Sequence, residues 1–573
     1  MSRKKFLFCS SALILLFQIV IAIASVEGQT SSHQKKEVVL VSVEQAEKSG
    51  TYSPQKKLSF LLSIKNISNE EQGGLLSYQI NNESSVRVLE NAFDLNIPAK
   101  KNIKTRVDIP FNIDGSFAIK FKINLNGVSW QTDFGFNFSS NGGARSQEEG
   151  FNISIKPDYA DGVFVGKAPI IYTATIKNTY KERAVGTLHL IVKDAVTGAV
   201  VSEKKTEINV AKRSNKKLFL NIAPPVKPGV YNIDFIVTTA NYEDTVCQAF
   251  AYEIANINNP YHRPVDFTAF WKNAMNDLAV INPAYHIQEL LEESTKSYRV
   301  YRVDMRSLDN IGISGLLTIP TTLIGSKFPV LVGYGGYQVK MQQTYFDDFA
   351  SFMINPRGTD KDSMQEINPD KKELLTLNIS DPQKYVYRGI YMDCVRAIDF
   401  LYQNEQLGFD LSRIAVFGGS QGGSLALVVS GLLGNKIQTC LADNPTFCDF
   451  NINLMMEPNI KEASFILKYF NNYIKENKGS VKKEDLLQTL NYFEVQNFIP
   501  LIKCPVLMGI GLLDPLAPAT TTIGAYNKLN QAAMKESEIY IFPDLAHEVP
   551  KKYNSFKSIW FYEKLAKGKK TRL

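Results

Sequence analysis

A serine flanked by glycines has the clearest chemical signature in this sequence. Gly418-Gly419-Ser420-Gln421-Gly422 fits the pattern G-x-S-x-G and lies between an apolar run at 414–417 and a helix-like run that starts near residue 424. This context is typical of a nucleophile elbow, a sharp strand-to-helix turn whose small residues let backbone segments pass closely. The helix N-terminus also favours negative charge near the hydroxyl. The motif predicts Ser420 as a nucleophile.

A serine nucleophile needs a general base. In proteins that carry such an elbow on an α/β sheet, the base follows the serine in the chain. The chain has five histidines, and only His547 lies after Ser420. It follows an apolar run at 538–542 that is expected to form a strand, so it is placed on a loop as a base should be. We therefore predict His547 as the base. The remaining histidines all precede the elbow: His33, His189, His262 and His286.

The base must be oriented by an acid that lies between the serine and the histidine in chain order. Asp514 follows the apolar run at 506–510, at the carboxyl end of an expected strand. Asp443 and Asp544 are competitors, although Asp544 is close to His547 in sequence for a residue on a separate loop. Asp514 is the predicted acid.

Acyl transfer also needs hydrogen-bond donors for the tetrahedral oxyanion, each worth about 3 kcal/mol. The backbone N–H of Gln421, directly after the nucleophile, is one predicted donor. The stretch 329–337, which contains three glycines, is the candidate for the second, because glycine allows close backbone approach. The chemistry needs no metal or organic cofactor, and no C-x-x-C pair or Cys/His cluster predicts a metal site.

The elements that hold these residues occupy the second half of a chain of 573 residues, a length that predicts several domains. From about residue 260, apolar runs alternate with helix-like segments, for example a helical pattern over 388–402. This texture predicts a doubly wound, mostly parallel sheet covered on both faces. Ligands bind such sheets beyond the carboxyl ends of the strands, where the predicted catalytic residues lie.

The first half of the chain has a different texture, with strict apolar alternation at 117–125 and 231–237. A basic stretch, a strand, a Gly turn and an alternating strand occur twice, with offsets of 112 to 114 residues. That spacing matches an immunoglobulin-like sandwich of about 100 residues. We predict two such all-β sandwiches, at 35–140 and 150–255, joined by the polar segment 139–150.

The N-terminus predicts export. Basic residues at positions 3–5 precede an apolar stretch at 6–24, and Ala22-Ile23-Ala24 is typical of a signal-peptidase site. Residues 1–24 are thus predicted as a signal peptide, which would place the protein outside the cytoplasm, secreted or periplasmic. The alternative is an uncleaved anchor. The net charge of +7 is small for this length and predicts no nucleic-acid partner.

An ordered series of motifs from residue 260 to the C-terminus resembles the acetyl xylan esterase and cephalosporin C deacetylase family, carbohydrate esterase family seven. The resemblance implies an α/β-hydrolase that removes acetyl groups from small glycans through an acyl-serine intermediate. It also implies that the Tyr337 backbone N–H completes the oxyanion hole. The motifs are Arg263-Pro264-Val265-Asp266-Phe267 with Phe270-Trp271, Asn355-Pro356-Arg357-Gly358, Tyr387-Arg388 through Asp393 to Ala397, Gly418 to Gly423, Thr489 to Phe498, Gly511 to Asp514, and His547-Glu548.

Two departures from the family limit what the resemblance implies. Gly335-Gly336-Tyr337 stands where the family often has H-G-Y, and the segment 337–355 is short. Such loops shape the acyl pocket and the family's oligomers, so acyl preference and oligomeric state stay open.

Two other functions stay open: an exported glycan-binding or scaffold protein with a silent hydrolase domain, and a serine peptidase of the prolyl-oligopeptidase type. Against the peptidase, the β-region lacks the propeller-blade period of about 40 to 50 residues.

Overall fold

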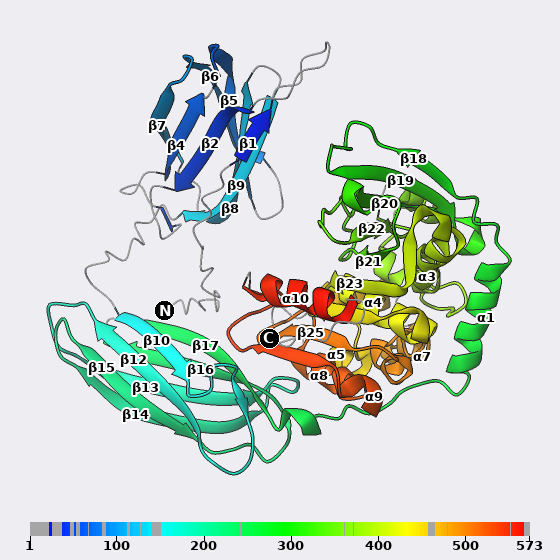
Figure 1. Ribbon diagram of the computed structural model, residues 1–573. Helices are drawn as coiled ribbons and strands as arrows, with labels where there is room; N and C mark the ends of the chain where they lie inside the picture. The colour runs from blue at the N-terminus through cyan, green and yellow to red at the C-terminus, as the bar shows by residue number, and fades with distance from the viewer. Residues whose placement is uncertain are drawn as a thin grey trace. The chain divides into compact units, whose positions relative to one another are not determined.

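Two β-sheets form the first β-rich region of the computed structural model (Figure 1). In β4, Phe60 and Ile64 are buried whereas Leu61 and Lys65 are exposed, as the period-two pattern predicts. The rings of Phe60 and Phe121 lie 4.8 Å apart in the core. One sheet has the order β1 (Ala22–Ser25), β2 (Glu37–Gln45), β4 (Leu58–Asn66), β7 (Asn102–Ile109), and the other β3 (Thr51–Tyr52), β9 (Val128–Phe138), β8 (Gly115–Leu125), β5 (Gln72–Asn82), β6 (Arg87–Ile97).

The residues described stop short of the whole chain. Most of the predicted signal segment and the predicted linker at 139–150 lie outside them, and β1 contains the predicted cleavage point after Ala24. The described residues are 22–25, 37–45, 51–52, 58–66, 68–82, 87–111, 115–125, 128–138, 151–240, 242–359, 361–370, 372–456, 465–477, 480–550 and 552–565.

The second β-rich region repeats the strand order of the first. Without β1, the two regions have the same number of strands in each sheet and the same neighbours in each sheet. The sheets here are β10 (Phe151–Pro157), β12 (Ile170–Asn178), β15 (Asn215–Ile222), and β11 (Val163–Phe164), β17 (Glu243–Tyr252), β16 (Gly229–Thr239), β13 (Ala184–Asp194), β14 (Val200–Val210).

A buried asparagine is used identically in the two β-rich regions. The Asn66 side-chain amide donates to three backbone carbonyls, those of Glu70, Ile97 and Pro98. Asn178, which lies 112 residues later in the sequence, donates to the carbonyls of Glu182, Val210 and Ala211. Both side chains are 0% exposed. The repeat predicted from the sequence offsets is therefore present in the strand order and in this polar contact.

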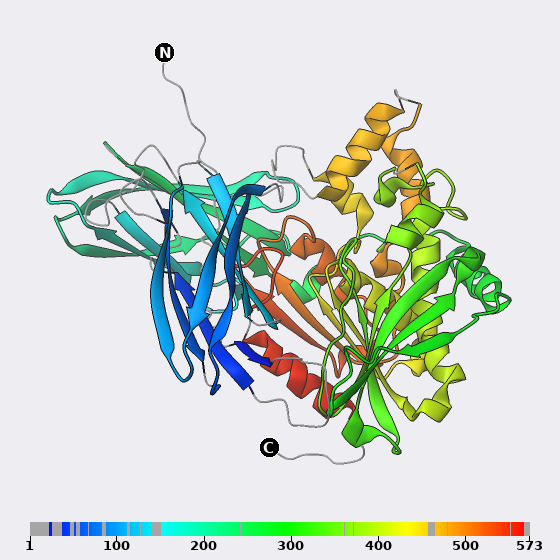
Figure 2. The ribbon, with the colours of Figure 1, turned by 90° about the horizontal axis from the view of Figure 1, so that it is seen from above.

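A nine-stranded sheet forms the C-terminal part of the chain. Its first three strands are antiparallel to their neighbours, and β21 to β26 run parallel to one another. Its strands fan out with the usual twist (Figure 2). The order is β18 (His286–Glu289), β19 (Tyr298–Arg306), β20 (Gly312–Pro320), β22 (Ala350–Asn355), β21 (Phe328–Tyr334), β23 (Phe409–Gly419), β24 (Thr439–Asp443), β25 (Val506–Gly511), β26 (Glu538–Phe542).

Both faces of this sheet are covered, which confirms the prediction of a doubly wound α/β fold. Val330 and Val332 of β21 belong to a large core that includes α3 and α4, whereas Leu331 between them packs with α10. Successive strand residues thus point to opposite helical layers. The helices are α1 (Phe267–Ala279), α2 (Lys361–Ile367), α3 (Val386–Gln403), α4 (Gln421–Leu433), α5 (Phe450–Met455), α6 (Phe465–Glu476), α7 (Lys483–Leu490), α8 (Ala519–Tyr526), α9 (Gln531–Met534) and α10 (Tyr553–Leu565).

The second β-rich region packs against the nine-stranded part. Val230 of β16 and Ala251 of β17 belong to the same apolar core as α3 and α4. The Asn527 side chain donates to the carbonyls of Ile254 and Ile257, each at 2.8 Å. By density of contacts the chain divides into two compact units, residues 1–152, 176–184 and 209–216 in one, and 153–175, 185–208 and 217–573 in the other.

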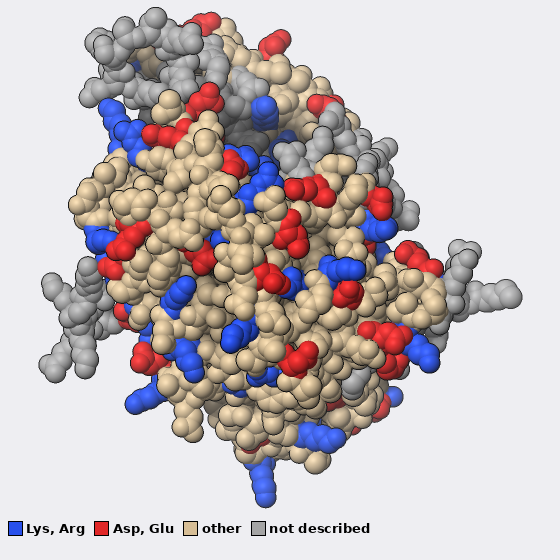
Figure 3. Space-filling view, turned by 90° about the vertical axis from the view of Figure 1, so that its right-hand side faces the viewer, with Lys and Arg blue, Asp and Glu red and all other residues tan. Residues whose placement is uncertain are grey.

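Charged side chains of both signs are interspersed on the face shown in Figure 3. Within the described residues, no helix is both long and apolar enough to cross a membrane.

Candidate active site

Ser420 occupies a strained turn between β23 and α4. Its φ of 57° and ψ of −128° lie in a region that non-glycine residues rarely adopt. The flanking glycines are required by space. A Cβ on Gly422 would lie 2.1 Å from the Tyr334 carbonyl oxygen, and one on Gly418 would lie 2.4 Å from the Gly422 carbonyl carbon. The elbow predicted from the motif is therefore present.

The elbow is fastened to the neighbouring strand. The backbone N–H of Ser420 donates to the carbonyl of Asp443 at 2.8 Å, just where β24 ends. The Ser424 hydroxyl, one turn into α4, donates to the Thr446 carbonyl at 2.5 Å. Because two segments hold the turn, its unfavourable dihedral angles can persist.

Asp514 and His547 form a hydrogen bond of 2.7 Å between Oδ2 and Nδ1. The other oxygen of Asp514 accepts from the backbone N–H groups of Leu516 and Ala517, at 2.8 and 2.9 Å. The Asp514 side chain is 0% exposed, and that of His547 is 21% exposed. The Asp514 carboxylate is thus held by two backbone N–H groups and the His547 ring, and the imidazole is partly exposed to solvent.

Short contacts join the two loops that carry this pair. The Leu513 N–H donates to the Leu545 carbonyl at 3.0 Å. Gly511, at the end of β25, passes so close that a Cβ would lie 2.0 Å from the Ala546 carbonyl oxygen. The Gly511 N–H donates to the Asn444 side chain at 2.9 Å. These contacts fix the acid loop against the base loop.

The three predicted residues lie at one edge of the sheet. Ser420 directly follows β23, Asp514 follows β25, and His547 follows β26. Since these strands run parallel and are neighbours through β24, their carboxyl ends meet at the same edge. The topology therefore brings the serine to the edge that carries the aspartate–histidine pair.

The competing carboxylates have different surroundings. Asp443 forms an ion pair with Lys557 at 2.7 Å. Burial raises the pKa of the Asp443 carboxyl, against the opposing effect of Lys557. Asp544 is exposed. Among the described residues, Asp514 is the carboxylate to which His547 is bonded.

The predicted oxyanion donors belong to two segments that approach Ser420. Gln421 is the first residue of α4, and its side-chain oxygen accepts from the buried Tyr387 hydroxyl at 2.6 Å. A Cβ on Gly336 would lie 4.0 Å from the Ser420 Cβ, so the 335–337 loop reaches the nucleophile. The Tyr337 hydroxyl is bonded to Glu373, and burial, followed by Glu373, raises its pKa.

Several residues that support the site have no sequence signal of their own. The packing of distant segments brings three side chains to the site: Asn444 accepts from Gly511, Tyr387 donates to Gln421, and Glu373 accepts from Tyr337. Tyr387 lies in a quoted motif, but nothing in its spacing indicates a bond to Gln421.

A buried acidic cluster lies on the segments that follow β24. Oε1 of Glu494 accepts from Phe450 N and the Asn451 amide, and Oε2 accepts from the Gln496 amide, all at 2.9 Å. Burial, with a smaller contribution from Asp449, raises the pKa of Glu494 to about 7.

Other motif residues have structural contacts. Arg357 forms two hydrogen bonds of 2.9 Å to the Asp393 carboxylate, and both side chains are buried. The Trp271 indole donates to the Tyr492 carbonyl at 3.0 Å. These contacts join segments that are far apart in sequence, which explains why the motifs span so much of the chain.

Residues 252–565 match the family model described as acetyl xylan esterase (AXE1). The acetyl esterase Axe7A of Xylanibacter ruminicola is 26% identical over 363 residues, 60% of this chain and 77% of that protein. An acetyl xylan esterase structure from Paenibacillus sp. R4 is 28% identical and covers 55% of this chain and 99% of its own, with a TM-score of 0.48. Acetyl xylan esterase 1 from Thermoanaerobacterium sp. JW/SL YS485 is 19% identical, covers 54% and 97%, and has the same TM-score of 0.48.

Proposed function

Because the chain belongs to the acetyl xylan esterase family and is a carboxylic ester hydrolase of the α/β-hydrolase superfamily, we propose that it removes acetyl or other small acyl groups from carbohydrate esters through an acyl-serine intermediate. The observation that carries the proposal is the Asp514–His547 hydrogen bond at the sheet edge where the Ser420 elbow lies. Acetylated xylo-oligosaccharides are the proposed substrate class.

In the first half-reaction Ser420 attacks the ester carbonyl carbon while His547 takes the hydroxyl proton. The Asp514 bond to Nδ1 leaves Nε2 as the ring nitrogen for this transfer. Asp514 stabilises the imidazolium that forms. When the C–O bond breaks, the same proton passes to the leaving sugar oxygen, and the acyl group stays on Ser420.

The developing oxyanion is stabilised by backbone donors. We assign the Gln421 and Tyr337 N–H groups to this role, since the first follows the nucleophile and the second lies on the loop that reaches Ser420. In the second half-reaction His547 removes a proton from water as the water oxygen attacks the acyl carbon. The bond from that carbon to Ser420 Oγ then breaks, His547 returns the proton to Oγ, and the carboxylic acid leaves. Each step uses only groups of this chain and water.

The rest of the chain fits an exported enzyme. We propose residues 1–24 as a cleaved signal peptide, immunoglobulin-like sandwiches at 35–140 and 150–255, and the catalytic domain at 260–573. Two sheets with shared strand order and a repeated buried asparagine support the pair of sandwiches.

The test is esterase activity of Ser420→Ala on 4-nitrophenyl acetate and acetylated xylo-oligosaccharides. Loss of the nucleophile should lower kcat by about 10⁴-fold or more, with unchanged circular dichroism. Ser430→Ala is the matched control, because this buried serine lies on the same helix and its hydroxyl donates to the Ala426 carbonyl, within the helix and away from the turn that carries Ser420.

Three results would contradict the proposal. Wild-type turnover by Ser420→Ala would exclude the nucleophile. Cleavage of X-Pro amides in preference to acetyl esters would indicate a peptidase, and glycan binding without any hydrolysis would indicate a silent scaffold.

A further inference from the structure

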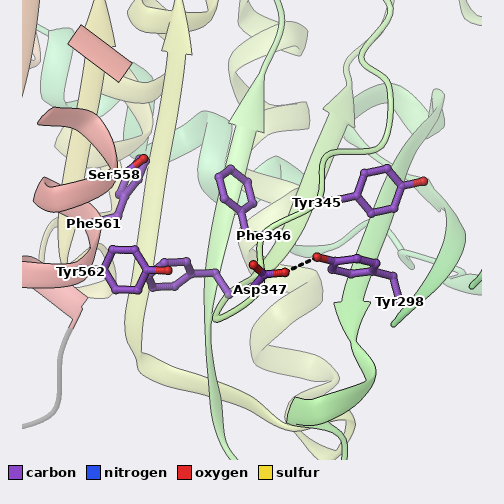
Figure 4. Close-up of a pocket in the computed structure, with 8 residues that line it drawn as sticks. Tyr298, Tyr345, Phe346, Asp347, Ser558, Phe561 and Tyr562 are labelled. Carbon is purple, nitrogen blue, oxygen red and sulfur yellow. Dashed lines mark hydrogen bonds between the residues drawn. The ribbon is translucent and has the colours of Figure 1, made fainter. Parts of the chain in front are cut away.

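A pocket lies away from the predicted catalytic residues (Figure 4). It has a volume of about 270 Å³, just below the usual range for small-molecule sites. Three elements contribute to it: the start of β19, the segment before β22, and α10. Six of its residues are aromatic. The lining residues are Tyr298, Tyr345, Phe346, Asp347, Phe349, Ser558, Phe561 and Tyr562.

The pocket is at the opposite edge of the sheet from Ser420. Tyr298 begins β19, and residues 345–349 lead into β22, so both lie at the amino ends of strands that run in the same direction. Ser420, Asp514 and His547 follow the carboxyl ends. The six residues of β22 separate the two edges by roughly 20 Å. An ester bound in this pocket is therefore out of reach of the nucleophile.

Two of the tyrosines are held in place by carboxylates. The Tyr298 hydroxyl donates to Asp347, and the Tyr562 hydroxyl donates to Asp348 at 2.7 Å. The rings of Tyr298 and Tyr345 lie 5.0 Å apart. Because their hydroxyls are bonded to carboxylates, Tyr298 and Tyr562 lose little freedom when a ligand packs on them, which favours binding.

The pocket also remains open to solvent. Tyr345 is 44% exposed and Tyr562 is 48% exposed. In Figure 4 the labelled side chains form a row, from Tyr562 and Phe561 through Phe346 and Asp347 to Tyr298 and Tyr345. The exposed tyrosines, Tyr562 and Tyr345, lie at the two ends of this row, which suits an extended ligand better than a compact one.

The chemistry of the lining selects the ligand class. A pyranose ring has apolar C–H faces, which pack on aromatic rings, and hydroxyl donors at its rim, which suit carboxylate acceptors. The charged residue of the lining is Asp347, and no basic residue is among the lining residues described. This excludes an anionic ligand. An organic cation is the competing class, since aromatic cages with carboxylates bind ammonium groups, but such a cage is compact.

We propose that this aromatic pocket is a second carbohydrate-binding site, which holds a stretch of a neutral oligosaccharide remote from the scissile ester. This inference rests on the proposed carbohydrate esterase function. The pocket would hold a polymeric substrate near the enzyme and would have no role with small esters.

The test is binding of unacetylated xylohexaose to full-length Ser420→Ala protein, measured by calorimetry. We expect saturable binding that weakens roughly two- to tenfold in Tyr562→Ala and in Tyr298→Ala, the range for loss of one aromatic packing contact. In otherwise wild-type protein, the same substitutions should raise KM for acetylated xylan and leave kcat/KM for 4-nitrophenyl acetate unchanged.

Phe556→Ala is the matched control, because Phe556 is 47% exposed on the same helix and is not among the lining residues. Asp347→Asn separates the two ligand classes, since it keeps an acceptor for a sugar and removes the charge that a cation needs. Tetramethylammonium is the cation probe.

The inference is overturned if xylohexaose does not bind, or if tetramethylammonium binds and Asp347→Asn abolishes that binding. It is also overturned if the pocket is covered by a second copy of the chain, seen as self-association that Tyr562→Ala disrupts. An inactive wild type that still binds xylohexaose would refute the esterase function and leave the pocket standing.

Discussion

Asp443 ends β24 and Asp514 follows the neighbouring strand β25, yet the two side chains have different partners. Asp514 accepts two backbone N–H groups and bonds His547, whereas Asp443 pairs with Lys557. A carboxylate bonded to Nδ1 fixes the tautomer of the imidazole, so Nε2 can accept a proton. The partner of each side chain, and not its place near a strand end, therefore distinguishes the proposed acid, Asp514, from Asp443.

Asp514→Asn should lower kcat by about 10⁴-fold with little change in the thermal midpoint, because an amide that donates to Nδ1 selects the wrong tautomer. Steady-state kinetics on 4-nitrophenyl acetate measure this. Asp544→Asn is the control, since Asp544 lies on the same loop as His547 and is exposed. Equal losses in the two variants would contradict the assignment.

Each β-rich region depends on an asparagine that replaces missing backbone contacts. The Asn178 amide donates to three carbonyls, and its oxygen accepts from the Tyr180 N–H at 2.9 Å. Those groups connect the end of β12 with the segment between β14 and β15. A buried carbonyl left without a donor costs about 1 to 3 kcal/mol, so this one side chain stabilises several strand ends.

Asn178→Ala should therefore destabilise its β-rich region by about 2 to 4 kcal/mol. Urea unfolding and hydrogen exchange of β12 to β15 measure the change. Asn215→Ala is the control, an exposed asparagine at the start of β15. Unchanged exchange in Asn178→Ala would show that solvent replaces these bonds.

Local patterns in the sequence predicted the elements and the three catalytic candidates. Ser420 can be predicted from the sequence because it lies in a motif, and His547 because it follows a strand pattern. Asn444, Glu373 and Tyr387 were missed because their partners are fixed only by the packing of distant segments. Turns and basic stretches predict the repeat, but an isolated asparagine has no pattern that would mark it, even though Asn66 and Asn178 share the 112-residue offset.

The whole molecule should respond to pH through its buried acids. Burial raises the pKa of Glu494 from 4.5 to about 7 and raises that of Asp449, while His262 and Lys528 oppose the shift of Asp449. Between pH 4.5 and about 7, Glu494 is protonated in the folded chain and ionised in the unfolded chain, so the folded chain binds more protons. Its free energy of unfolding must then fall as pH rises through this window.

Glu494→Gln should flatten this dependence between pH 4.5 and about 7, since the amide cannot ionise. Thermal midpoints of wild type and variant across the window measure the difference, and the two curves should diverge most above pH 7. Parallel curves would show that Glu494 ionises equally in both states.

The buried asparagine of the first β-rich region also determines how the protein can be produced. Asn66-Ile67-Ser68 is an N-glycosylation acceptor sequence, whereas Asn178-Thr179-Tyr180 is not. The Asn66 amide is 0% exposed and bonded to three carbonyls. A secretory host that attaches a glycan before folding would place a bulky sugar on a side chain that must be buried. Expression in such a host should yield a misfolded first β-region unless Ser68 is replaced.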